Sequence, residues 1–244
     1  MTPFSDEVLL MLLIVGLYLY DSALLLFANE ALLTTARRGW KVRFGLREPR
    51  IRGRELYVPA PWLLHRPLYR LSWQFDGNSS QAAPQDWDAR KSVPAALAFF
   101  VWLFAFSLFV LLPLGFFLPA AKILLLAAVV LLYPGIIAAL AYLWTHREPL
   151  GLTKVQIGKL AFEYLICPPF ALNLVRAISL ARPISEDLIA AARRLESPDD
   201  WKRTRDELLP RLDEEIEMEQ DEASPRMAAL RAHRAALTTE SSSN

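Results

Sequence analysis

Apolar residues form three long stretches along the chain, and strongly polar segments separate them. The stretches are Val8–Leu33, Pro94–Leu118 and Ile123–Leu143, and the second and third contain no charged side chain. About 20 apolar residues are enough to cross the hydrocarbon core of a bilayer as a helix. The pattern therefore predicts an all-α membrane protein with three transmembrane helices, the first within residues 1–35 and the other two forming a helical hairpin within 94–145.

Positive charges between the first two stretches predict how these helices are oriented. Residues 36–93 carry 12 Lys and Arg residues, whereas the connection between the second and third stretches carries only Lys122. Cationic loops stay in the cytoplasm, so we expect 36–93 to form a basic cytoplasmic loop. The N-terminus is then outside and the C-terminus cytoplasmic. In a bacterium the membrane would be the plasma (inner) membrane.

The basic loop contains two short segments that suit β-strands. Trp40–Phe44 alternates apolar and basic residues, which is the period of a strand. Arg54–Val58 is its expected partner, with the turn between Gly45 and Gly53. The sequence therefore predicts a small β-hairpin in this loop, lying against the inner leaflet.

The residues after the third stretch change from interfacial to soluble character. Within 146–183, Thr153–Gln156 has the pattern of a capping box, and Cys167–Pro169 breaks an apolar run. Two short interfacial helices are the favoured interpretation, and a fourth span is the alternative. Residues 184–244 predict a soluble, helical cytoplasmic tail whose helices begin near Ser185, Ser197 and Ser224.

Polar side chains interrupt the first stretch on one side of the expected helix. At about 100° per residue they form one stripe, which consists of Tyr18, Asp21, Ser22 and Asn29. A carboxylate inside a membrane is costly and normally faces a protein interior, where it has a partner. The favoured interpretation is a contact with another helix or a partner subunit. An ion or proton site at Asp21 is the alternative.

The densest group of cations opens the basic loop and is interleaved with aromatic residues, as at a membrane interface. Each cation gains about 1 kcal/mol next to an anionic membrane surface. We therefore predict contacts with lipid headgroups from Arg37, Arg38, Lys41, Arg43, Arg47, Arg50, Arg52 and Arg54. In the alternative interpretation these charges only set the orientation. The formal net charge is +1 and no nucleic-acid-binding module occurs, so nucleic acid is not an expected partner.

No motif in the sequence points to catalysis, a metal or a cofactor. Three His residues and one Cys lack metal-ligand spacing, and Cys167 alone permits no internal disulfide. An enzyme acting on lipid headgroups could use His65 or His146, but neither lies in a catalytic motif. The sequence thus favours a non-enzymatic membrane subunit or scaffold that binds a protein partner or a second copy. The alternative is a small transporter or channel component that works through Asp21.

Overall fold

The computed structural model describes residues 5–37, 39–73, 86–182, 184 and 186–242, and the chain divides into two compact units. Unit 1 comprises Met1–Leu24, Val58–Pro67 and Asp86–Arg182. Unit 2 comprises Leu25–Tyr57, Leu68–Gln85 and Pro183–Asn244. Each unit therefore combines segments that lie far apart in the sequence.

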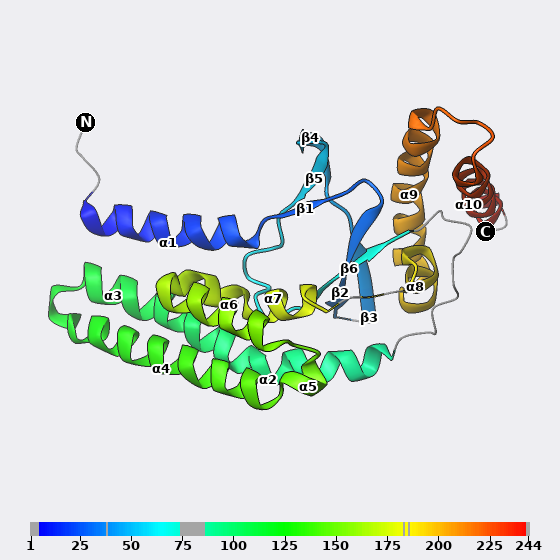
Figure 1. The fold of residues 1–244 in the computed structure, drawn as a ribbon. Helices are drawn as coiled ribbons and strands as arrows, with labels where there is room; N and C mark the ends of the chain where they lie inside the picture. The colour runs from blue at the N-terminus through cyan, green and yellow to red at the C-terminus, as the bar shows by residue number, and fades with distance from the viewer. Residues whose placement is uncertain (1–4, 38, 74–85, 183, 185, 243–244) are drawn as a thin grey trace. The chain divides into compact units, whose positions relative to one another are not determined.

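Unit 1 is built from helices (Figure 1), which are α1 (Asp6–Ser22), α2 (Trp87–Phe106), α3 (Leu112–Phe117), α4 (Ile123–Thr145), α5 (Arg147–Leu150), α6 (Lys154–Ile166) and α7 (Leu174–Leu180). A π-helical turn, Ser107–Leu111, joins α2 to α3 directly before Pro113. Proline cannot donate a backbone hydrogen bond, and the wider turn accommodates the missing donor.

The core of unit 1 surrounds a 3₁₀ turn, Pro168–Asn173, which connects α6 to α7. This turn contacts α1, α2, α4 and α6. Its residues Ala171 and Leu172 are fully buried, together with Val101 and Phe104 of α2. Irregular backbone is tolerated next to apolar helices when neighbouring protein covers it, and here the turn is covered.

Two helical segments in the described part of the chain are long and apolar enough to cross a membrane, and they are Ala96–Phe117 and Ile123–Thr145. They correspond to the second and third apolar stretches. Gly115 lets α3 and α4 approach closely, because a Cβ at this position would lie 2.9 Å from the backbone nitrogen of Leu125.

The prediction of an all-α protein with three spans is wrong. Helix α1 ends at Ser22, and the rest of the first apolar stretch forms strands β1 (Leu24–Leu26) and β2 (Glu30–Ala36). Ala31, Leu32, Leu33 and Thr34 are all buried, so both faces of β2 are covered. A strand that is buried on both faces has a continuous apolar run, which periodicity cannot distinguish from a helix. With two candidate spans, the reason for placing the N-terminus outside is lost.

Unit 2 contains two antiparallel sheets of three strands, so the fold mixes helices and strands. In one sheet β2 lies between β3 (Gly39–Arg43) and β6 (Leu68–Ser72), with Leu33 opposite both Val42 and Tyr69. In the other sheet β5 (Arg54–Tyr57) lies between β1 and β4 (Leu46–Ile51).

The two strands that the sequence predicted are present, but the predicted hairpin between them is wrong. Strand β3 pairs with β2, and β5 pairs with β4. Two tight turns cause this arrangement. Gly39 has a φ of 91°, and Arg52 and Gly53 both have positive φ in the β4–β5 connection. Positive φ at both central residues is what a type I′ turn in a two-residue hairpin requires.

Three helices complete unit 2, namely α8 (Leu188–Leu195), α9 (Pro198–Met218) and α10 (Pro225–Ser242). Helices α8 and α9 contact β3, and α10 packs on α9. The predicted helix starts at Ser197 and Ser224 are confirmed, since Ser197 caps α9 and α10 begins at Pro225. The cap of α8 is Asp187, whereas the predicted Ser185 lies outside the described residues.

Residues 146–183 contain the capping box expected at Thr153, whose side chain accepts a hydrogen bond from the Gln156 backbone and whose backbone bonds the Gln156 side chain. Helix α6 ends at Ile166, before the proline pair, and α7 begins only at Leu174. Residues 146–183 therefore contain α5, α6, the 3₁₀ turn and α7, and the position of this segment relative to a membrane stays a prediction.

Candidate functional site

The main polar site of unit 1 is a cluster around Arg176, which is only 3% exposed. We call Tyr18, Asp21, Ser22, Asn173 and Arg176 the arginine cluster. Tyr18, Asp21 and Ser22 come from the last turns of α1, and Asn173 and Arg176 come from the junction of the 3₁₀ turn with α7. Three members of the predicted polar stripe therefore meet in one place.

The guanidinium of Arg176 donates to groups from three parts of unit 1. Its Nη1 donates to the Asn173 Oδ1 at 3.0 Å, to the Ser22 Oγ at 3.3 Å and to the Tyr18 hydroxyl at 3.4 Å. Its Nη2 donates to the backbone carbonyls of Ala60 and Leu63, at 3.1 and 3.2 Å. A buried cation is stable only when several acceptors replace its water, and this cation has five.

Hydrogen bonds among the other members complete the arginine cluster. The Asn173 Nδ2 donates to the Asp21 carboxylate at 2.8 Å, and the Tyr18 hydroxyl donates to the Pro61 carbonyl at 2.8 Å. The Ser22 hydroxyl donates back to the Tyr18 carbonyl at 2.7 Å. The end of α1, the segment around Pro61 and the start of α7 are thereby fixed to one another, so the cluster has the geometry of a structural clamp.

Asn29, the fourth member of the predicted stripe, does not join this cluster. It lies in unit 2 next to β2, where its Nδ2 donates to the Trp73 carbonyl at 3.4 Å. The stripe was drawn on a continuous helix, and the helix ends at Ser22. Arg176 and Asn173 were missed as site residues, although a charged and a polar residue in an apolar run are a signal for a buried partner.

The predicted cationic residues occupy several environments in unit 2. Lys41 pairs with Asp200 of α9, and both Arg47 and Arg50 reach Glu214 of the same helix, at 3.5 and 2.6 Å. A cleft of about 630 Å³ lies there, lined by Arg47, Glu48, Arg50 and Glu214. Its lining has two charges of each sign and gives no net attraction for an anion.

The other predicted cations lie at strand ends and turns. Arg43 is exposed at the end of β3, Arg52 is exposed in the β4–β5 turn, and the guanidinium carbon of Arg54 lies 4.3 Å from the centre of the Phe27 ring. Arg37 is exposed at the end of β2, and Arg38 lies outside the described residues. Their contact with lipid headgroups stays a prediction.

An ion pair between Arg211 of α9 and Glu55 of β5 lies in the interior of unit 2, with both side chains buried. The Arg211 Nη2 donates to the Glu55 carboxylate at 2.9 Å and to the Gly45 carbonyl at 3.0 Å. The guanidinium carbon also lies 4.4 Å from the centre of the Phe44 ring. This pair joins the helical tail to the sheet of β4 and β5.

The carboxyl of Glu214 makes the contact between α9 and β4 sensitive to acid. The hydrogen bond from Arg50 lowers the pKa of Glu214 from its ordinary value of 4.5. A lowered pKa means that the contact contributes stability above the ordinary value and that this stability is lost as the pH falls through the lowered pKa.

Replacing Glu214 with Gln is therefore expected to remove part of the acid dependence of unfolding and to cost about 0.2–1 kcal/mol at neutral pH, as for other partly exposed pairs. The measurement is the urea midpoint of unfolding at pH 7 and at pH 4, with Glu217→Gln on the exposed side of α9 as control. If Glu214→Gln kept the acid dependence of the unmodified chain, the assignment would be wrong.

The described residues contain no group of three His, Cys, Asp or Glu side chains placed to hold a metal ion. The two histidines considered for lipid chemistry lie in separate surroundings. The His65 ring packs on Trp102, and the His146 ring stacks on Tyr142 within α4 and the turn that follows. Comparisons of the chain with protein-family models, with curated proteins and with solved structures found no match.

Proposed function

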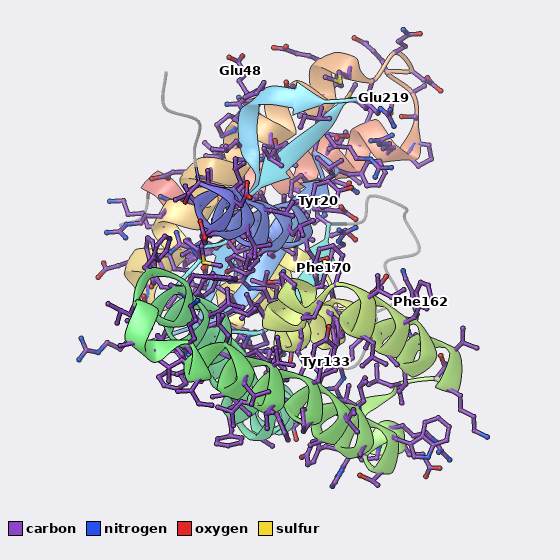
Figure 2. All side chains as sticks on the ribbon, turned by 90° about the vertical axis from the view of Figure 1, so that its left-hand side faces the viewer. Tyr20, Glu48, Tyr133, Phe162, Phe170 and Glu219 are labelled. Carbon is purple, nitrogen blue, oxygen red and sulfur yellow. The ribbon has the colours of Figure 1, made fainter. Side chains whose placement is uncertain are left out.

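We propose that the protein is a non-enzymatic membrane subunit, in which the α2–α4 hairpin is embedded in the bilayer and unit 2 forms a cytoplasmic module for assembly with a protein partner. The observation that carries the proposal is the apolar outer surface of unit 1. Ile123 on α4 is 70% exposed, and Phe99 on α2 is 68% exposed. Phe162 lies on the outer side of α6 (Figure 2) and is also largely exposed.

Lipid is the solvent that suits such a surface. Contiguous exposed apolar patches on soluble monomers rarely exceed a few hundred Å², and here exposed large apolar side chains occur along α1, α2, α3, α4 and α6. Core helices of soluble proteins bury most of their apolar residues, whereas only 22% of the apolar window in α4 is buried. The surface of unit 1 therefore supports membrane embedding.

A hairpin of two spans places both of its flanking segments on the same side of the membrane. Unit 2 is assembled from segments before the first span and after the second span, which this topology permits. The cations of residues 36–93 favour the cytoplasmic side. The proposed orientation therefore has unit 2 in the cytoplasm.

The arginine cluster supports a structural role for the polar end of α1 in preference to ion transport. The Tyr18 hydroxyl, the Ser22 hydroxyl and the Asn173 Oδ1 each accept a hydrogen bond from Arg176 within the cluster. The Asp21 carboxylate accepts a hydrogen bond from the Asn173 amide, which is the kind of protein partner expected for a carboxylate in an apolar segment. The charged surfaces of unit 2 are then the remaining candidates for contact with a partner.

The test is to wash membranes that contain the tagged chain with alkaline carbonate, extract them with mild detergent and identify the retained proteins by mass spectrometry. We expect the chain to stay in the carbonate-washed membranes and to retain one stoichiometric protein partner. Cells with the untagged chain are the control. Release by carbonate would contradict embedding, and recovery of the chain alone or only with copies of itself would contradict assembly with a partner.

A further inference from the structure

The two faces of the β4–β5 hairpin differ in chemistry. Arg50 and Glu55 are paired in the ladder, and they form the ion pairs with Glu214 and Arg211 of α9 described above. The adjacent pair, Ile51 and Arg54, points to the other face because side chains alternate along a strand. One face of the hairpin therefore pairs with α9, and the other face carries Ile51 and Arg54.

This second face combines exposed apolar side chains with cations. Ile51 is 43% exposed, and Phe27, which follows β1 in the same sheet, is 48% exposed beneath the guanidinium of Arg54. Arg52 is exposed in the turn between the two strands. We call Phe27, Ile51, Arg52 and Arg54 the hairpin patch. The carboxylate of Glu30, which accepts a hydrogen bond from the Phe27 backbone, is neutralised by an ion pair with Arg70.

We propose that the hairpin patch docks on the anionic surface of the membrane in which the α2–α4 hairpin is embedded. The arginines would bind lipid phosphates, and Phe27 and Ile51 would enter the boundary between headgroups and acyl chains. The inference rests on the proposed membrane embedding and adds a second, lipid-dependent contact from unit 2.

Composition and charge both fit this occupant. Interfacial surfaces combine an apolar side chain that enters the headgroup boundary with basic side chains that bind anionic lipid. The arginines of the patch differ from Lys41, Arg47 and Arg50, whose charges are already paired with α9. The chain also passes from one unit to the other at several points, which keeps unit 2 tethered to the embedded hairpin.

The test uses the full chain in lipid nanodiscs, with Cys167→Ser and Ile51→Cys and a nitroxide label on the new cysteine. Oxygen, which partitions into the bilayer, and a water-soluble nickel chelate compete to relax the label. In discs that contain phosphatidylglycerol we expect relaxation dominated by oxygen. In discs of phosphatidylcholine alone we expect relaxation dominated by nickel.

Arg52→Gln with Arg54→Gln should weaken the docking about 30-fold, which corresponds to the loss of two basic contacts of about 1 kcal/mol each. The control removes two exposed arginines elsewhere in unit 2, with Arg231→Gln and Arg234→Gln, and should leave the label unchanged. A label that stays accessible to nickel in both kinds of disc would overturn the proposal. So would a label that is immobilised by protein and insensitive to lipid composition.

Elution of the chain with the discs after a wash in high salt reports the embedding of the α2–α4 hairpin separately. A chain that stays with the discs while its label remains aqueous overturns only the docking of the hairpin patch. A chain that salt removes from the discs overturns the proposed membrane embedding as well.

Discussion

Replacing Arg176 with Met is expected to destabilise unit 1 by about 1.5–3 kcal/mol, which is the contribution of a hydrogen bond to a charged group. The variant keeps most of the side-chain volume but removes the charged donor to the buried Asn173 Oδ1 and to the carbonyls of Ala60 and Leu63, which retain backbone donors from Leu63 and Arg66. The stability of Arg176→Lys should lie between that of the unmodified chain and that of Arg176→Met, because one ammonium has three donors for five acceptors. The measurement is the midpoint of thermal unfolding in detergent.

Lys159→Met serves as the control for the loss of a cation, since this side chain is 75% exposed and pairs with Glu163 on its own helix. Its unfolding midpoint should stay close to that of the unmodified chain. An unchanged midpoint for Arg176→Met would show that the arginine cluster does not fix α1 to α7, and would reopen the question of what Arg176 does.

Replacing Glu55 with Leu is expected to destabilise unit 2 by about 3–5 kcal/mol, because it leaves the guanidinium of Arg211 buried without its carboxylate. The double variant Glu55→Leu with Arg211→Met should recover most of this loss. The Glu55 Oε1 and the Arg211 Nε have no hydrogen-bond partner in the described structure, so the pair is incompletely satisfied. An apolar replacement of such a pair is often neutral or stabilising.

Urea unfolding of the two single variants and the double variant measures this coupling. Glu217→Leu on the exposed side of α9 is the control for adding an apolar residue in place of a glutamate. If the double variant were no more stable than Glu55→Leu, the two side chains would not be coupled as expected, and the argument from incomplete hydrogen bonding would fail.

Sequence patterns found the elements whose physical cause is local. The Thr153 capping box, the Ser197 cap and the apolar helices of the α2–α4 hairpin depend on neighbouring residues or on uniform composition. Each of these features was therefore readable over a short window of the chain.

The sequence-based predictions were wrong where contacts between distant segments determine the structure. Leu32 and Leu33 lie in β2, between β3 and β6, and both side chains are buried. In the sequence, however, these two residues extend the apolar run of α1. The same misplaced helix put Asn29 on one stripe with Tyr18. Asp21 and Asn173 are 152 positions apart, so no local pattern joins them.

The interleaving of the two units has a consequence for biosynthesis. Glu55 leaves the ribosome before the α2–α4 hairpin is made, and its partner Arg211 follows 156 residues later. During that interval the early strands hold a carboxylate without its counter-ion and a face without α8 and α9. Unit 2 can therefore close only after the α2–α4 hairpin has been synthesised. Any interruption of synthesis before the tail emerges leaves the sheet exposed to chaperones and proteases.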